Sequence, residues 1–437
     1  MPIGLLAFIV AAGLLSLILL GLPIAFALGM TGMAGIVAAT GPTAWIDFAG
    51  GAALHNLSHF GLLAIPLFVL MGAYITESGM GPRLIDFASQ WFRRFPGYLH
   101  TASIVACGIF ASMSGSSIAT AAAIGGVILP EMKRRGHNMR FGMGAVAAGG
   151  TLGIIIPPSN AFIIYGVLTE TSIGKLFIAG VLPGILLVVL FVAFNSILFT
   201  VKPDLNPRKE HAAVDWGARL ASLRRIWTGL VLIFAVIGGI FFGVVTPTEA
   251  AALGALVALI LGMYVLRGLS WRSAHKAAIS AVQITAMVGF IIYGGLILGR
   301  GLALLQLSQE LVGLVEHADL NRWTVMILIN LFLLFLGLLL DAAAITLITI
   351  PLLFPVIDSL GFDPVWFGIV FSLNMELALI TPPVGINLFV IKGITGEKMK
   401  DVILGAAPYA GIVAAVIALI MVFPGIATWL PDQMFEF

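Results

Sequence analysis

The sequence predicts an all-α polytopic membrane protein with two inverted-topology repeats, each with a re-entrant helical hairpin and a transmembrane helix broken at two adjacent prolines. Three observations predict this fold class. The composition is strongly apolar, apolar runs of membrane-spanning length follow one another along the chain, and prolines and glycines recur at a constant shift. Matched apolar segments interrupted by Gly and Pro in two halves of a membrane protein are typical of a secondary transporter.

The composition excludes a soluble domain long enough to fold alone. Hydrophobic residues make up 60% of the 437 positions and charged residues 10%, whereas soluble domains carry about 25% charged residues. A helix needs roughly 20 apolar residues to cross the hydrocarbon core of a membrane. Apolar runs of spanning length cover residues 3–22, 23–40, 60–76, 98–130, 141–168, 176–200, 226–245, 247–266, 277–299, 323–357, 364–393 and 402–430. The net charge of +2 gives no indication of nucleic acid binding.

The clearest signal is the internal repeat. Between residues 98 and 200 the chain contains four prolines, and moving each one by 225 positions reaches another proline. The pairs are Pro130 and Pro355, Pro157 and Pro382, Pro158 and Pro383, and Pro183 and Pro408. Proline occupies only 21 of the 437 positions, so four matches are very unlikely to arise by chance. The two halves are therefore predicted to share one helical pattern.

Basic residues predict the orientation, because cytoplasmic loops carry an excess of Lys and Arg. All but three of the 22 basic residues fall in clusters that we assign to the cytoplasm; the exceptions are Lys175, Arg300 and Arg322. Basic clusters flank 98–132 on both sides, which predicts a hairpin that enters and leaves at the cytoplasmic face. Its shifted copy, 323–357, lies between poorly basic loops and is expected to enter from outside. Counting the spans then places the N-terminus and the C-terminus in the periplasm.

The tip of the first hairpin and the following broken helix carry the candidate ion site. The tip is a serine-rich turn at 112–117, and the helix after it presents its N-terminus to an anion. Within 141–168, Pro157 and Pro158 remove two amide donors and free the carbonyls from Gly153 to Ile156. These carbonyls and the serine oxygens suit a hard cation such as Na⁺. The alternative is a proline kink whose serines bond back to their own helix.

The second half repeats these parts with altered chemistry. Asp341 matches Ser116, and a charged side chain at the centre of a membrane costs about 2.5–3.5 kcal/mol on insertion scales. We therefore predict a second cation site at Asp341, with capping of the following helix as the alternative. The expected companions are oxygen-bearing groups in the hairpin and the second broken helix, namely Thr346, Asn374, Thr381 and the carbonyls from Ala378 to Thr381.

Three further polar residues each allow two interpretations. Asn160 and Asn387 flank the proline pairs and either hydrogen-bond a substrate or brace the broken helices. Glu376 is either a coupling residue or an outward-facing carboxylate near the membrane edge. The single cysteine, Cys107, lies in an apolar run and is assigned to core packing.

The repeat and the charge pattern divide the chain into five parts. The stretch 203–225 combines Trp216 and Leu220 with arginines and is predicted to form a cytoplasmic interfacial helix. The parts are scaffold helices at 1–97, the first hairpin and broken helix at 98–200, the linker at 201–225, further scaffold helices at 226–322, and the second hairpin, broken helix and last span at 323–437.

Four long motifs resemble a known family. They read SGSSIATAAAIGGVILPEMKRRG, AAGGTLGIIIPPSNAFIIYG, GVVTPTEAAALGAL and ITPPVGINLFV. They are similar to the large membrane subunit of TRAP transporters (tripartite ATP-independent periplasmic transporters), and the resemblance covers nearly the whole chain. It implies an elevator-type secondary transporter, similar to the ion transporter superfamily, that imports organic acids such as a dicarboxylate or sialic acid by Na⁺ symport. No enzymatic activity and no organic cofactor are implied.

The resemblance also implies particular site residues. One Na⁺ site would use Ser114, Ser116, Gly153, Ile156 and Pro158, largely through carbonyls. A second would use Asp341, Ala378, Thr381 and Pro383. We expect the substrate near Ser117, Asn160, Thr346 and Asn387.

The resemblance implies partners as well. Substrate would arrive on a periplasmic substrate-binding protein, and a small membrane subunit of four helices would complete the scaffold in the lipid of the bacterial inner membrane. Because the chain begins directly with the large-subunit pattern, the small subunit is expected to be a separate polypeptide.

Three alternative functions are weaker. A stand-alone Na⁺/dicarboxylate symporter of similar inverted architecture would transport without a binding protein. An ion channel would need a continuous polar pore, whereas two facing hairpins favour an occluded site. An intramembrane protease would need a second membrane aspartate beside Asp341, or a serine paired with a base, and the sequence predicts neither.

Overall fold

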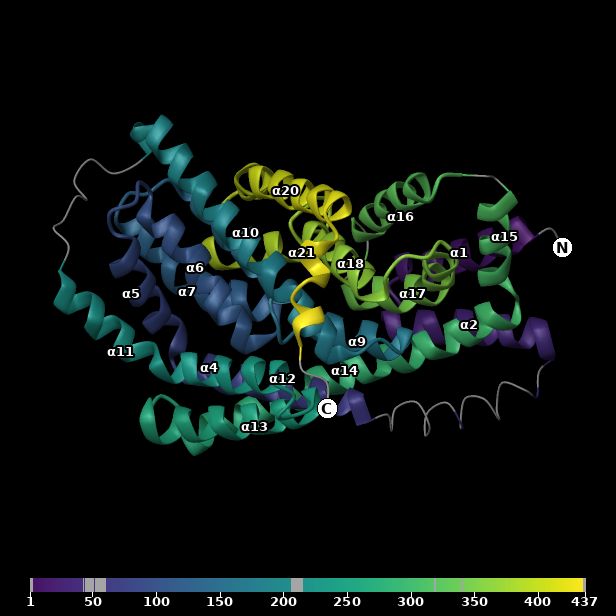
Figure 1. The fold of residues 1–437 in the computed structure, drawn as a ribbon, viewed down its shortest axis with the longest axis horizontal. Helices are drawn as coiled ribbons and strands as arrows, with labels where there is room; N and C mark the ends of the chain where they lie inside the picture. Colours follow the sequence, from purple (N-terminus) through teal and green to yellow (C-terminus); the bar gives the residue numbers. More distant parts are fainter. Residues whose placement is uncertain are drawn as a thin grey trace.

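The computed structural model describes residues 3–41, 43, 51, 60–205, 215–317, 320–338, 340 and 342–434. Within these ranges the chain is helical and contains no β-strand (Figure 1). Among the described residues, eight helices are long and apolar enough to cross a membrane. They span Phe60–Glu77, Met139–Thr169, Ile173–Val201, Trp216–Phe241, Pro247–Val265, Trp271–Leu304, Ala342–Ser359 and Met399–Val422. The expected all-α polytopic architecture is therefore confirmed.

The helices of the first half begin with four that precede the candidate site. These are α1 (Ile3–Leu19), α2 (Ile24–Thr40), α4 (Ala64–Glu77), which follows the short helix η1 (Phe60–Leu63), and α5 (Met80–Phe92). The site is built on the next five, α6 (Tyr98–Ser114), α7 (Ser117–Arg134), α8 (Met139–Ile155), α9 (Asn160–Thr169) and α10 (Ile173–Val201).

The second half contains the same series of elements. It begins with α11 (Trp216–Ile233), α12 (Gly239–Phe241), α13 (Pro247–Ile260), α14 (Trp271–Leu304) and α15 (Leu307–His317). It continues with α16 (Arg322–Gly337), α17 (Ala342–Ser359), α18 (Pro364–Leu379), α19 (Ile386–Thr395), α20 (Met399–Val422) and the short α21 (Gly425–Thr428). The starts of α7 and α17 are 225 residues apart, and so are the starts of α8 and α18. The repeat seen in the prolines is thus a repeat of helix boundaries.

Packing between the halves is reciprocal. Helix α2 packs on α14, and their counterparts α13 and α4 also pack on each other. In the same way α7 contacts α19 of the other half, while α17 contacts α9. A contact that recurs with the partners exchanged is what a two-fold relation between two similar units produces.

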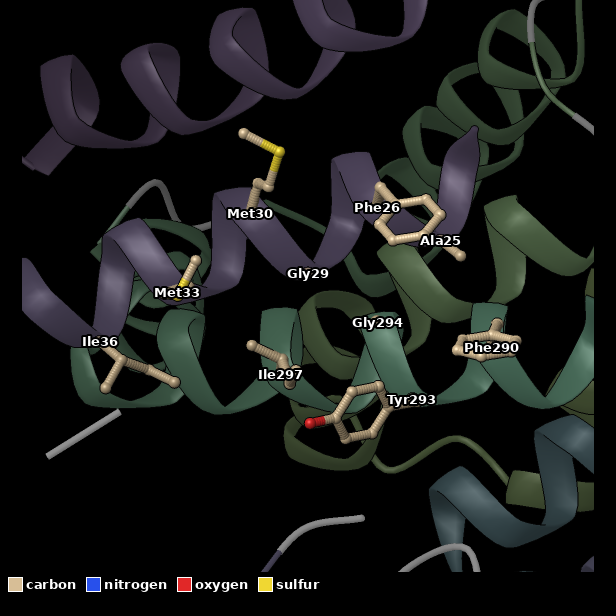
Figure 2. Close-up of a pocket in the computed structure, with 10 residues that line it drawn as sticks. All are labelled: Ala25, Phe26, Gly29, Met30, Met33, Ile36, Phe290, Tyr293, Gly294 and Ile297. Carbon is tan, nitrogen blue, oxygen red and sulfur yellow. The ribbon is translucent and has the colours of Figure 1, made fainter. Parts of the chain in front are cut away.

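Glycines bring the halves close together where α2 crosses α14. A Cβ on Gly301 would lie 2.6 Å from the carbonyl oxygen of Gly32, so only glycine fits there. Small residues of this kind allow close backbone approach in membrane helices. Beside the crossing is a pocket of about 240 Å³ lined by apolar side chains that include Phe26, Met30 and Phe290 (Figure 2).

The linker differs from the prediction. A separate interfacial helix was expected over 203–225, of which 206–214 lie outside the described residues. Beyond them α11 begins at Trp216 and runs to Ile233, and a π-helical turn at Phe234–Gly238 carries it into α12. No helix-breaking residue separates the arginine-rich part from the apolar part, so both form one continuous helix. Helix α11 therefore continues across residue 225, and the division of the chain at that residue stays a prediction.

Candidate ion and substrate site

The first tip, defined here as residues 114–117, joins α6 to α7 by a tight turn. Gly115 has a φ of 61° and ends α6, since its N–H donates to the carbonyl of Ala111. Ser116 then caps α7, its side-chain oxygen accepting a hydrogen bond from the Ala119 N–H. A left-handed residue is easiest to form with glycine, which explains the sharp return of the chain. The helix break therefore lies in the serine-rich turn where the sequence predicts it.

The serines of this region are not equivalent. Ser114 Oγ lies 2.9 Å from Thr120 Oγ1 across the turn, and Thr120 Oγ1 donates to the carbonyl of Ser116. Ser112 instead donates to the carbonyl of Ile109 in its own helix. The local alternative that the sequence allowed thus applies to Ser112, whereas Ser114 contributes to the turn.

The first break, defined as residues 156–159, separates α8 from α9. The peptide bond between Pro157 and Pro158 is cis, and α9 starts directly after Ser159. The residues four positions after Gly153 and Ile154 are these prolines, which have no N–H to donate. The carbonyl oxygens of Gly153 and Ile154, two of the four that were expected to be free, therefore lack the N–H donor four positions on.

The first tip packs directly on the first break. A Cβ on Gly153 would lie 2.8 Å from the carbonyl carbon of Ser116. A Cβ on Gly115 would lie 2.8 Å from the carbonyl oxygen of Pro158. The fold thus brings Ser116 against Gly153 and Gly115 against Pro158. Ser114 precedes Gly115 in the first tip, and Ile156 lies on the first break.

Two buried oxygens at this junction have no hydrogen-bond partner among the described residues. They are the hydroxyl of Ser159, which is 1% exposed, and the side-chain carbonyl of Asn160. Buried polar atoms are nearly always paired, so each unpaired one calls for an explanation. Ser159 was not among the predicted ligands, although its place directly after the proline pair was a usable signal.

The second break, defined as residues 380–385, separates α18 from α19. The peptide bond between Pro382 and Pro383 is again cis, and Thr381 Oγ1 donates to the carbonyl of Leu377. Ala378 lies one turn earlier and packs against Gly337 of α16. Asp341, the residue expected at the centre of the second cation site, lies outside the described residues.

The side chains of two predicted companions of Asp341 form hydrogen bonds with other residues. Thr346 is fully buried and donates to the carbonyl of Ala342 in its own helix. Asn374 donates from its side-chain amide to the side chain of Asn330 and to the carbonyl of Val370. The structure therefore places Asn374 between α16 and α18.

Asn387 braces the two halves. Its side-chain nitrogen donates to Ser117 Oγ at 2.8 Å and to the carbonyl of Ala147 at 3.1 Å. These bonds join α19 to the first turn of α7 and to α8. Of the two interpretations open for Asn387, the structure shows the bracing contact.

Glu376 is fully buried, which excludes an outward-facing carboxylate at the membrane edge. The hydroxyl of Thr151 lies 2.8 Å from its Oε1 atom. Sequence reasoning missed this contact, although the two residues stand 225 positions apart and are therefore equivalent in the repeat.

A large cavity lies beside these elements. Its volume is about 1200 Å³, and its wall is formed by η1, the α9–α10 turn, the segment before α13, and parts of α14 and α17. The polar residues that line it are Glu170, Thr171, Ser172, Thr246 and Thr248.

Paired helix breaks within an apolar, multi-pass helical chain are typical of membrane transporters of the secondary type. The family model of the tripartite ATP-independent periplasmic transporter, DctM component, matches residues 11–426. The chain belongs to this family. Its members are transporters rather than enzymes, and the family points to the bacterial inner membrane.

Curated relatives agree over nearly the full length. The chain is 39% identical to the C4-dicarboxylate TRAP transporter large permease protein DctM of Pseudomonas aeruginosa, over 86% of this chain and 87% of that protein. It is 36% identical to the protein of that name from Rhodobacter capsulatus, over 98% and 99%. It is 32% identical to the sialic acid TRAP transporter large permease protein SiaM of Vibrio cholerae, over 96% and 97%.

Solved structures show the same fold in distant proteins. The YdaH transporter of Alcanivorax borkumensis aligns with a TM-score of 0.65 at 14% identity, over 89% of this chain and 90% of that one. MtrF of Neisseria gonorrhoeae aligns with a TM-score of 0.62, also at 14% identity, over 90% and 85%.

Proposed function

We propose that this chain is the large membrane subunit of a Na⁺-coupled TRAP transporter that imports an organic acid. The observation that carries the proposal is the junction of the first tip and the first break. There the first tip packs on the first break, and the buried oxygens of Ser159 and Asn160 have no hydrogen-bond partner among the described residues. The proline pair also leaves the carbonyls of Gly153 and Ile154 without the N–H four positions on. Broken helices in secondary transporters use such carbonyls and helix C-terminal ends to coordinate Na⁺.

The first Na⁺ ion would be held at this junction, by Ser114, Ser116, Gly153, Ile156 and Pro158 with Ser159 added. The second would be held at the second break, by Asp341, Ala378, Thr381 and Pro383. Carbonyl, hydroxyl and carboxylate oxygens are hard ligands that suit cations of this kind. Na⁺ is thus cargo rather than a resident cofactor.

The substrate would be a carboxylate, with a C4-dicarboxylate or sialic acid suggested by the relatives' names. The N-terminal ends of α7 and α9 point their N–H groups toward the breaks, and such ends attract anions. Asn160 is the best-placed substrate residue, because its amide oxygen is unpaired. Ser117, Asn387 and Thr346 would act by shaping the site, since each already has a hydrogen bond.

The transport mechanism would be of the elevator type. We place α6–α7 and α16–α17 as re-entrant hairpins from opposite faces of the membrane, with both termini in the periplasm. The reciprocal packing of α7 on α19 and α17 on α9 supports two repeats of inverted topology. In this orientation the 1200 Å³ cavity opens to the periplasm, where a substrate-binding protein delivers its ligand. A small membrane subunit would complete the scaffold.

Reconstitution in proteoliposomes with the binding protein and the small subunit tests the proposal. An inward Na⁺ gradient should drive uptake of a C4-dicarboxylate, and a proton gradient in Na⁺-free buffer should not. Equal uptake under both gradients would contradict Na⁺ coupling. Robust uptake by this chain alone would instead support a stand-alone symporter.

A further inference from the structure

Thr151 and Glu376 meet where the two repeats come together. They occupy equivalent positions in the two halves, on α8 and α18, and their side chains are in hydrogen-bond contact at 2.8 Å. Equivalent positions of two units related by a two-fold operation touch each other only close to the axis. Both side chains are fully buried, and neither belongs to the proposed Na⁺ ligands.

The hydrogen atoms at this contact determine the state of the carboxyl group. Thr151 Oγ1 lies 2.7 Å from the carbonyl oxygen of Ala148 and 2.8 Å from Glu376 Oε1. A hydroxyl has one hydrogen to donate, so it serves only one of these two oxygens. With an ionised Glu376, one of the two short contacts would join two acceptors. With a protonated Glu376, the acid donates to Thr151, and Thr151 donates to Ala148.

The charges around Glu376 lead to the same conclusion. Its Oε2 atom is buried without a partner among the described residues, and burying an unpaired ionised carboxylate is far more costly than burying a neutral acid. The titratable residues on the helices packed against α18 are Arg140, Tyr165, Lys175, Arg322, Asp358, Lys392, Lys400, Asp401 and Tyr409. All the charged ones lie in terminal turns of their helices, and both tyrosine hydroxyls donate to other oxygens. In the described structure, no cation is paired with Glu376.

We propose that Glu376 is a proton-binding site on the line where the two repeats meet. Its carboxyl group carries a proton in the folded protein and donates it, as a hydrogen bond, to Thr151 Oγ1.

Infrared difference spectroscopy of the full chain in detergent at pH 7 tests the proposal. Glu376→Gln should remove a carbonyl stretching band of a protonated carboxylic acid from the spectrum. Glu310→Gln is the matched control, because Glu310 is exposed on α15, and this variant should leave that band in place. Loss of carboxylate bands in Glu376→Gln, in Na⁺ or in K⁺ buffer, would overturn the proposal and indicate an ionised residue.

A second variant, Thr151→Val, tests the protonation of Glu376 if Glu376→Gln does not fold. Thr151→Val removes the acceptor of the acid proton, so the protonated-acid band should shift to higher frequency. Thr349→Val is the control, since Thr349 is buried and bonded only within its own helix. An unshifted band in Thr151→Val would overturn the proposal.

Discussion

The two proline breaks share one design but differ in how they are covered. The first proline pair is buried beneath the first tip, whereas the second pair is exposed. The close approach in the first half depends on Gly115 and Gly153, which correspond in the second half to Leu340 and Ala378. Side chains at those two positions occupy space that the two glycines leave open in the first half. Prolines interrupt the helix at both breaks, and in the first half Gly115 and Gly153 allow the first tip to pack against the break.

The largest expected effect is a difference in accessibility between the breaks. Ser159 and Val384 occupy equivalent positions; the first is buried and the second is half-buried. A membrane-impermeant maleimide added to the protein in detergent should modify Val384→Cys extensively and Ser159→Cys hardly at all. The native Cys107 is fully buried and serves as the unreactive internal control. Equal modification of both variants would show that the breaks are equally covered.

Filling the first junction should produce the next largest effect. Gly153→Ala places a methyl group against the backbone of Ser116, and overpacking of this kind costs about 1–3 kcal/mol. We expect the Na⁺ concentration for half-maximal uptake to rise roughly 5- to 150-fold. Gly126→Ala on α7 is the control, because a Cβ there meets no atom within 4 Å. Unchanged Na⁺ dependence in Gly153→Ala would separate the junction from ion binding.

A substitution of Asp341 tests the proposed second Na⁺ site. Replacing it by Asn removes the negative charge but keeps the size of the side chain. If it ligates Na⁺, half-maximal uptake should require about tenfold more Na⁺, which corresponds to about 1.4 kcal/mol. Assembly with the small subunit, measured by co-purification, should remain intact. Lower expression with unchanged Na⁺ dependence would identify Asp341 as a helix cap instead.

The smallest effect is expected from a single hydroxyl of the first break. Ser159→Ala removes one neutral oxygen, worth about 1 kcal/mol, so the half-saturating Na⁺ concentration should rise about fivefold. Ser112→Ala is the matched control, since the hydroxyl of Ser112 is bonded to its own helix. Equal shifts in the two variants would show that Ser159 has no special role.

Sequence reasoning located the helix breaks but not the contacts between them. Prolines and glycines act on their own backbone, so the turn at Gly115 and the end of α8 before Pro157 followed from residue type. The contact of Thr151 with Glu376 depends on how two distant helices lie, which spacing alone does not define. The extent of α11 did not follow from the sequence, because a change from polar to apolar residues does not by itself end a helix.

The hydrogen bonds of Asn387 have a consequence for binding. They connect the helix after the second break to the first turn of α7 and to α8, close to the first break. Binding of an ion at one break should therefore also restrict the motion of the other break. The second ion then binds to a site that is already partly ordered. Under the proposed Na⁺ coupling, the two ions should bind cooperatively, with a Hill coefficient above one in the wild type and closer to one in Asn387→Ala.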